Sequence, residues 1–236
     1  MNTISNHGGS YLKDYKVIVK DNVLQKDMYY KDELVLTYKI KYPKFISDMF
    51  KSFLNDLNHM YKENAIHYVN YQIEKMYQMA IEEYEHSVAN DYPIRVYEAY
   101  TDYTITYNQN CVISLYFDKY VYTGGAHGGT ERTSDAWDLQ AEDELELSAL
   151  LQIPNYKDFL IQQIQEQIQQ NIKEGNNYYF EDYSSLVEEH FNIQNFYLSD
   201  DGIVIYFQQY DIGPYSSGIL TFTIPYSADN IKVPGC

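Results

Sequence analysis

The sequence is poor in cysteine, in tryptophan and in basic residues. Its 236 residues include two cysteines, one tryptophan, and 17 Lys and Arg against 34 Asp and Glu. No CxxC pair and no Cys/His spacing of a zinc site occurs, so the sequence does not encode a structural zinc module. Whether Cys111 and Cys236 are bonded is left open, and two thiols alone do not indicate a redox compartment.

The shortage of basic residues gives the chain a formal net charge of -17. Such a chain repels a phosphate backbone and an anionic membrane surface, which argues against nucleic acid as a partner. A basic protein or a cation is the complementary partner. The alternative is that the acidic side chains serve solubility alone.

Long apolar runs are also missing. The first residues, MNTISNHGGSYLKDYKV, have neither a basic n-region nor an apolar h-region, so no signal peptide is predicted. No stretch is long enough to form a transmembrane segment. Either the protein is cytoplasmic or Met1 begins a trimmed chain, and the sequence leaves both possibilities open.

Tyrosine, in contrast, is abundant, with 28 Tyr against 10 Phe. A tyrosine buries its ring and keeps its hydroxyl in water. So many tyrosines indicate a thin core with half-exposed faces, or a contact surface.

The apolar periodicity predicts an α+β fold in which antiparallel sheets pack against two main amphipathic helices. The first helix is expected over residues 47–89, with Ser47 as its N-cap, and the second over residues 156–173. Alternation predicts strands before, between and after them: two or three within residues 15–42, hairpins over 97–122 and 196–207, and a last strand over 220–226.

The clearest strand is predicted to end at Pro43. Residues 1–14 are predicted to be disordered. We expect two subdomains, 15–118 and 119–236, that pack as one unit.

Two segments of the second half resemble a known family. The first is Tyr120–Gly128, with the sequence YVYTGGAHG, and the second runs from Tyr197 to Tyr226 and contains PYSSG. Both resemble domain-of-unknown-function family 3298, and the half from about Val35 to Tyr116 resembles its usual companion, family 4163. This pair forms the ectodomain of the RsiV anti-sigma factors, which are lysozyme receptors, and the non-catalytic region of PdaC-type peptidoglycan deacetylases.

The resemblance implies a non-catalytic, extracytoplasmic ligand-binding module of the cell envelope that needs no cofactor. Lysozyme is the partner that the resemblance implies most specifically, and peptidoglycan fragments come second. The sequence departs from both families: it contains no sigma-binding segment or transmembrane helix, and no His/Asp spacing of a deacetylase metal site. Two alternatives remain open, namely an enzyme or accessory domain acting on cell-wall glycan, and a Tyr-rich structural surface protein.

The glycine-rich segment is the most distinctive local motif of the chain. Its residues are Thr123, Gly124, Gly125, Ala126, His127 and Gly128. One interpretation makes His127 a ligand or base in an exposed loop. The other, which we favour, is that the glycines allow a tight turn with positive φ, so that the loop is a scaffold feature joining the two halves. The motif lacks the spacing and the lysine of a phosphate-binding loop.

No other pattern predicts catalysis. The histidines outside the motif lack HExxH or HxxxH spacing, so a metal site is not predicted; they are His7, His59, His67, His86 and His190. The acidic run Glu142–Glu146 could supply the two carboxylates of a glycosidase, but a solvated surface is the commoner meaning of such runs. No GxSxG motif is present. We therefore expect no enzymatic activity.

The segment from Asp211 to Gly218 is the predicted partner-binding loop. It resembles the matching loop of the lysozyme receptors, and its candidate contact residues are Asp211, Pro214, Tyr215, Ser216 and Gly218. A tyrosine on a proline-stiffened loop is a suitable contact anchor. The alternative is that Tyr215 folds back onto the sheet as part of the core.

Overall fold

The structure is a computed structural model that describes residues 16–176, 178–228 and 231–235. The segment 1–14, expected to be disordered, and Cys236 lie outside these residues. Helices and strands both occur in quantity, which confirms the α+β class. In the described part of the chain, no helix combines the length and the apolar character needed to cross a bilayer.

The chain divides into two compact units, but each unit is built from separate stretches of the sequence. They therefore differ from the expected subdomains 15–118 and 119–236. Of the described residues, unit 1 comprises 16–17, 104–116 and those from 132 onward, and unit 2 comprises 18–103 and 117–131. The division cuts three strands, because β3, β4 and β5 each contribute residues to both units.

One sheet has six strands in the order β1-β2-β3-β4-β5-β6. The strands are β1 (Ile18–Tyr30), β2 (Glu33–Ile46), β3 (Tyr97–Gln109), β4 (Val112–Tyr122), β5 (Gly129–Asp138) and β6 (Asp143–Glu144). β1 and β2 form an antiparallel hairpin, but β2 and β3 are parallel. This pair departs from the expected antiparallel arrangement, because the long helix between β2 and β3 carries the chain back along the sheet.

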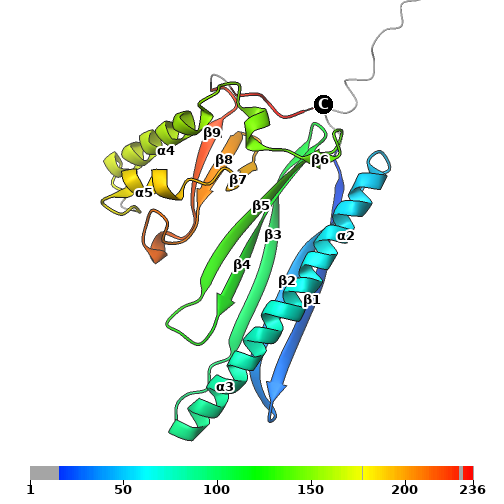
Figure 1. The fold of residues 1–236 in the computed structure, drawn as a ribbon, viewed down its shortest axis with the longest axis vertical. Helices are drawn as coiled ribbons and strands as arrows, with labels where there is room; N and C mark the ends of the chain where they lie inside the picture. Colours follow the sequence, from blue (N-terminus) through cyan, green and yellow to red (C-terminus); the bar gives the residue numbers. More distant parts are fainter. Residues whose placement is uncertain (1–15, 177, 229–230, 236) are drawn as a thin grey trace, which may run out of the picture. The chain divides into compact units, whose positions relative to one another are not determined.

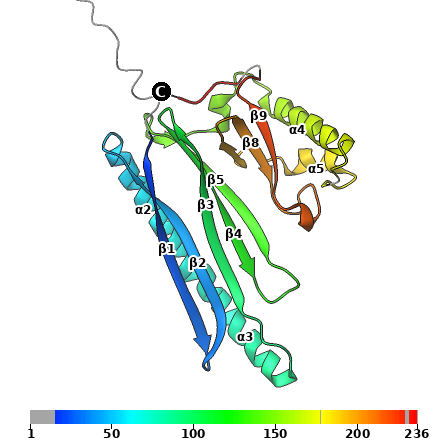
Figure 2. The ribbon, with the colours of Figure 1, turned by 180° about the vertical axis from the view of Figure 1, so that it is seen from behind.

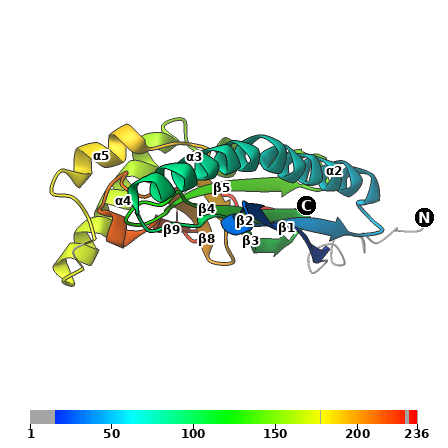
Figure 3. The ribbon, with the colours of Figure 1, turned by 90° about the horizontal axis from the view of Figure 1, so that it is seen from below.

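The long helix of unit 2 covers one face of its strands (Figures 1 and 3). It consists of α2 (Lys51–Tyr68), a π-helical turn (Val69–Ile73) and α3 (Glu74–Asn90). Helix and sheet bury a common core whose members include Leu36, Ile40, Ile73, Met76 and Ala99. The alternation predicted for β3 is confirmed, since Tyr97, Ala99 and Thr101 are buried and Tyr100 and Asp102 are exposed. In β2 it holds from Leu36 to Ile40, but Val35, expected on the opposite face from Leu36, is buried as well.

Two boundary predictions are wrong. β2 does not end at Pro43 but continues to Ile46, with Pro43 opposite Asp21 of β1. The register with β3 ends at Ile40, so the missing N–H of Pro43 interrupts no bond to that strand. The first helix begins at Lys51 rather than next to Ser47, whose hydroxyl instead accepts the N–H groups of Met49 and Phe50.

Unit 1 contains a second, three-stranded sheet with α4 and α5 (Figure 1). The strands are β7 (Phe196–Leu198), β8 (Gly202–Phe207) and β9 (Leu220–Pro225), paired antiparallel in the order β7-β8-β9. The helices are α4 (Tyr156–Lys173) and α5 (Tyr183–His190), and short 3-10 turns cover Leu147–Leu150 and Tyr215–Ser217. The core joins the apolar stripe of α4 to Ile203, Ile205 and Phe207 of β8, a strand whose six residues are all buried.

Candidate functional site

The negative charge of the protein is concentrated in one part of the chain. Residues 132–236 carry 4 Lys and Arg against 17 Asp and Glu, a net charge of -13 out of the total of -17. This segment supplies most of unit 1. Unit 2, with 11 basic and 16 acidic residues, is close to balanced. A cationic partner would therefore be attracted mainly to unit 1.

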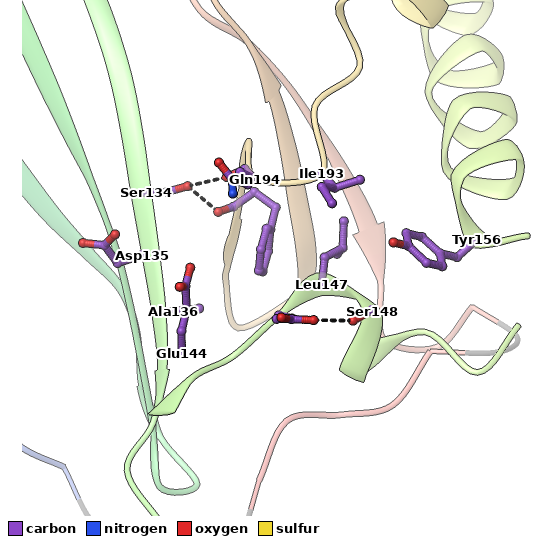
Figure 4. A pocket seen from close by; sticks show the side chains of 11 residues that line it. Ser134, Asp135, Ala136, Glu144, Leu147, Ser148, Tyr156, Ile193 and Gln194 are labelled. Carbon is purple, nitrogen blue, oxygen red and sulfur yellow. Dashed lines mark hydrogen bonds between the residues drawn. The ribbon is translucent and has the colours of Figure 1, made fainter. Parts of the chain in front are cut away.

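Unit 1 contains an acidic pocket of about 320 Å³ (Figure 4). Three acidic residues are among those that line it, namely Asp135, Glu144 and Glu146, although the Asp135 side chain lies on the opposite side of β5 from Ser134 (Figure 4). The remaining wall is mixed, with polar groups and apolar surface from Ser134, Ala136, Leu147, Ser148, Tyr156, Ile193, Gln194 and Phe196. Two of the three carboxylates come from the acidic run Glu142–Glu146, which the sequence singled out, and β5 supplies the third.

The electrostatics of the acidic pocket favour a cation. Burial raises the pKa of the Glu144 carboxyl, and the neighbouring charges of Asp135, Glu146 and Asp143 raise it further. Like charges held together disfavour the ionised form, and a bound cation relieves this repulsion. Among the described residues, no three His, Cys, Asp or Glu side chains are placed to hold a metal ion. The acidic residues of the pocket would attract a positively charged group of a partner.

The predicted partner-binding loop is held to unit 1 at its base. One carboxylate oxygen of Asp211 accepts the N–H of Gln208 at 2.7 Å, and the other lies 3.7 Å from Nδ1 of His190. Burial raises the pKa of Asp211, while the bond from Gln208 and the charge of His190 oppose that rise. Asp211 is thus a half-buried anchor of the loop rather than an exposed contact residue.

The rest of the loop packs against the segment before α5. Ile212 is fully buried and its carbonyl accepts the N–H of Phe180, while the hydroxyl of Ser217 donates to the carbonyl of Tyr178 at 2.8 Å. This leaves the tip to present Pro214 and Tyr215, which are half-buried, and Ser216, which is exposed. Gly218, with φ of 65°, ends the 3-10 turn.

Two tyrosines lie together at this loop. The rings of Tyr210 and Tyr215 have centroids 5.9 Å apart, and Tyr210 is 56% exposed. Tyr215 is therefore half-buried: it packs against Tyr210 and is not part of the buried core. The sequence analysis did not include Tyr210 among the candidate contact residues, although it directly precedes the predicted loop.

The glycine-rich segment connects β4 to β5 within unit 2, rather than joining the two halves as expected. Gly124 has φ of 85°, and its carbonyl accepts a hydrogen bond from Arg95. His127 is exposed, and its Nδ1 lies 3.1 Å from the carbonyl oxygen of Gly128. Within this segment, Gly124 is the one glycine whose positive φ favours glycine over other residues.

Replacing Gly124 by valine is expected to lower the free energy of unfolding by ~1–3 kcal/mol, because a β-branched residue is strained at positive φ. Gly125 is the matched control. It is not among the residues with positive φ, and an added Cβ would meet nothing closer than 3.8 Å. Urea denaturation of both variants measures the difference. Equal effects at the two positions would contradict the role assigned to φ.

One cluster in unit 1 was missed by the sequence analysis. The guanidinium of Arg132 lies 3.7 Å from the ring centroid of Tyr116 and 5.9 Å from those of Tyr197 and Tyr206. The amide of Gln208 bonds both backbone groups of Arg132, at 2.9 and 2.6 Å. No local signal predicts the cluster, because its members come from β4, β5, β7 and β8.

Cys111 forms a disulfide, and the only other cysteine of the sequence is Cys236, which lies outside the described residues. The histidines considered as ligands do not gather in the described part of the chain: His59, His67 and His86 lie along the long helix of unit 2, and His190 ends α5 in unit 1. His7 lies outside the described residues.

Comparisons with known proteins match the two halves of the chain to different family models. The family model for deacetylase PdaC matches residues 30–130, and that for a protein of unknown function, DUF3298, matches residues 150–227. No curated protein matches.

Two solved structures are similar over most of their length. A DUF3298-family protein from Bacteroides fragilis NCTC 9343 has a TM-score of 0.71 and 18% identity, covering 92% of this chain and 94% of that one. A DUF3298-family protein from Pseudomonas aeruginosa PAO1 has a TM-score of 0.56 and 15% identity, covering 91% and 93%. At these identities the likeness shows the fold. The chain thus combines a segment similar to deacetylase PdaC with a segment similar to DUF3298, in the fold of two solved DUF3298 proteins.

Proposed function

We propose that this protein is a non-catalytic binding module of the cell envelope whose unit 1 binds a basic protein, lysozyme being the specific candidate. The observation that carries the proposal is the net charge of -13 in residues 132–236, and three acidic residues are among those that line the pocket of this segment. Such a field steers a cationic protein toward unit 1 and speeds its association. The PdaC match supports the cell envelope, and the lysozyme partner comes from the resemblance to RsiV ectodomains.

Two further features support this proposal. The partner-binding loop is anchored by Asp211, Ile212 and Ser217, so its tip is ordered before a partner arrives and loses little entropy on binding. The disulfide at Cys111 favours an oxidising compartment, as expected outside the cytoplasm.

Titration calorimetry of chicken-type lysozyme into the protein tests the proposal. Replacing Tyr215 by alanine is expected to weaken binding about thirtyfold, which corresponds to ~2 kcal/mol for a contact anchor. Tyr92→Ala is the matched control, because Tyr92 is 58% exposed in unit 2 and should leave affinity unchanged. Glu144→Gln should weaken binding at low salt more than at physiological salt.

Binding that disappears at physiological salt would leave only unselective charge attraction, and would contradict the proposal. So would binding by wild type and Tyr215→Ala with equal affinity, because the loop would then not be the contact.

A further inference from the structure

A pair of parallel tyrosines lies on the face of unit 2 that its helix does not cover. In Figure 2 the strands of this unit are in front of α2 and α3, and the face toward the viewer carries no helix of that unit. On β3, Tyr97, Ala99 and Thr101 are buried toward the helix, so Tyr100 points to the opposite face, where it is 37% exposed. Tyr120 of β4 lies beside it, with ring centroids 6.2 Å apart and ring planes 17° apart.

The last residue of the glycine-rich segment determines how Tyr120 lies. Gly128 is buried, and a Cβ added to it would fall 2.4 Å from the ring carbons of Tyr120. The ring therefore leans across the sheet onto the bare backbone of Gly128. Any larger residue would lift it away from this position. With a 6.2 Å separation, the two rings are offset side by side rather than face to face, and together they offer a flat aromatic surface.

Hydrogen-bonding groups of both signs surround this surface. Lys39 of β2 is directly opposite Tyr100 in the parallel register. Thr37 of β2 pairs with Glu98 of β3 and with Asp27 of β1, and Glu98 is two residues from Tyr100, so both acidic residues belong to the same face of the sheet as Tyr100. Burial, followed by the charges of Glu98 and Asp27, raises the pKa of the Tyr100 hydroxyl. Thr37 donates to Asp27 at 2.7 Å. Unlike the acidic pocket, this surface carries groups of both signs, which can donate hydrogen bonds to a neutral polar ligand and accept them from it.

We propose that the Tyr100–Tyr120 surface binds a neutral β-linked oligosaccharide through the faces of its pyranose rings. Equatorially substituted pyranoses present flat C–H faces, and these weakly positive hydrogens contact the negative face of an aromatic ring. The hydroxyls at the sugar rim bond to ammonium and carboxylate groups such as those of Lys39, Glu98 and Asp27. Two adjacent rings accommodate at least two sugar units. The site shares no residue with the proposed protein-binding region of unit 1.

The test is titration calorimetry of the full chain with chitotetraose and, separately, with cellotetraose, which differ in the acetamido group. Binding of either one is expected, and the stronger one identifies the preferred sugar. Tyr100→Ala should weaken it about tenfold, equivalent to about 1.4 kcal/mol. Tyr92→Ala, which removes an exposed tyrosine elsewhere in unit 2, should have no effect.

Tyr120→Phe tests whether the ring or the hydroxyl of Tyr120 is needed for binding, because it keeps the ring over Gly128 and removes only the hydroxyl. It should retain binding, whereas Tyr120→Ala should lose it. Absence of binding to both sugars at millimolar concentration would overturn the proposal. Equal binding by wild type and Tyr100→Ala would also overturn it, and would leave Tyr120 as a structural cover for Gly128 only.

Discussion

Phe207→Ala is expected to lower the free energy of unfolding of this protein by ~3–5 kcal/mol. Phe207 ends β8 and is 1% exposed. Its ring meets Phe222 of β9 edge to face, with centroids 5.8 Å apart. Truncation removes apolar area from the core of unit 1 and leaves a cavity that strands on either side cannot close, since β8 is the central strand.

Urea denaturation followed by far-UV circular dichroism measures this loss. Ile172→Ala is the control, because Ile172 is 38% exposed on α4 of the same unit and its removal should cost less than ~1 kcal/mol. Similar losses for the two variants would show that the core of unit 1 is not centred on β8.

Gly213→Ala is expected to destabilise the protein by ~3 kcal/mol and to abolish the ordered presentation of Tyr215. An added Cβ at Gly213 would lie 2.2 Å from the carbonyl oxygen of Tyr178, a main-chain atom that cannot rotate away. The loop must therefore separate from the segment before α5. The hydrogen bond from Ser217 to that same carbonyl would be lost with it.

Gly218→Ala is the control that separates the clash at Gly213 from backbone strain elsewhere in the loop. Gly218 has φ of 65° and ψ of -146°, but an added Cβ would meet nothing within 4 Å, so only the cost of this backbone conformation, ~1–3 kcal/mol, applies and no contact with the rest of unit 1 is broken. Thermal unfolding and lysozyme titration of both variants give the comparison. Binding retained by Gly213→Ala would show that the anchored loop conformation is not the recognised one.

Secondary structure followed from the sequence where one face of an element is buried. The apolar periodicity of residues 47–89 predicted the long helix, whose buried residues include Leu54, Leu57 and Tyr61, and alternation predicted the strands of the 97–122 hairpin. Element ends were less predictable. Ser47 and Pro43 have the local preferences of a cap and a strand end, but contacts beyond their own segments decided the boundaries.

The sequence predicted separate parts of the candidate site but not how they come together in space. The partner-binding loop was visible as a motif, and the run Glu142–Glu146 as a charge cluster, but Asp135 joins Glu144 and Glu146 through strand pairing between β5 and β6. The cluster around Arg132 and the Tyr100–Tyr120 pair are likewise made by neighbouring strands. Residues far apart in sequence meet there without any local signal.

The sequence by itself determined the α+β class, the positions of the main helices and hairpins, and the excess of acidic residues. These properties depend on local periodicity and composition, which act over one element at a time. Only the tertiary structure decided that β2 and β3 are parallel, that Gly128 supports the ring of Tyr120, and that three acidic residues lie around one pocket. Each of these depends on strand register and close approach of backbone, because a shift of one residue would turn every side chain of a strand to the other face.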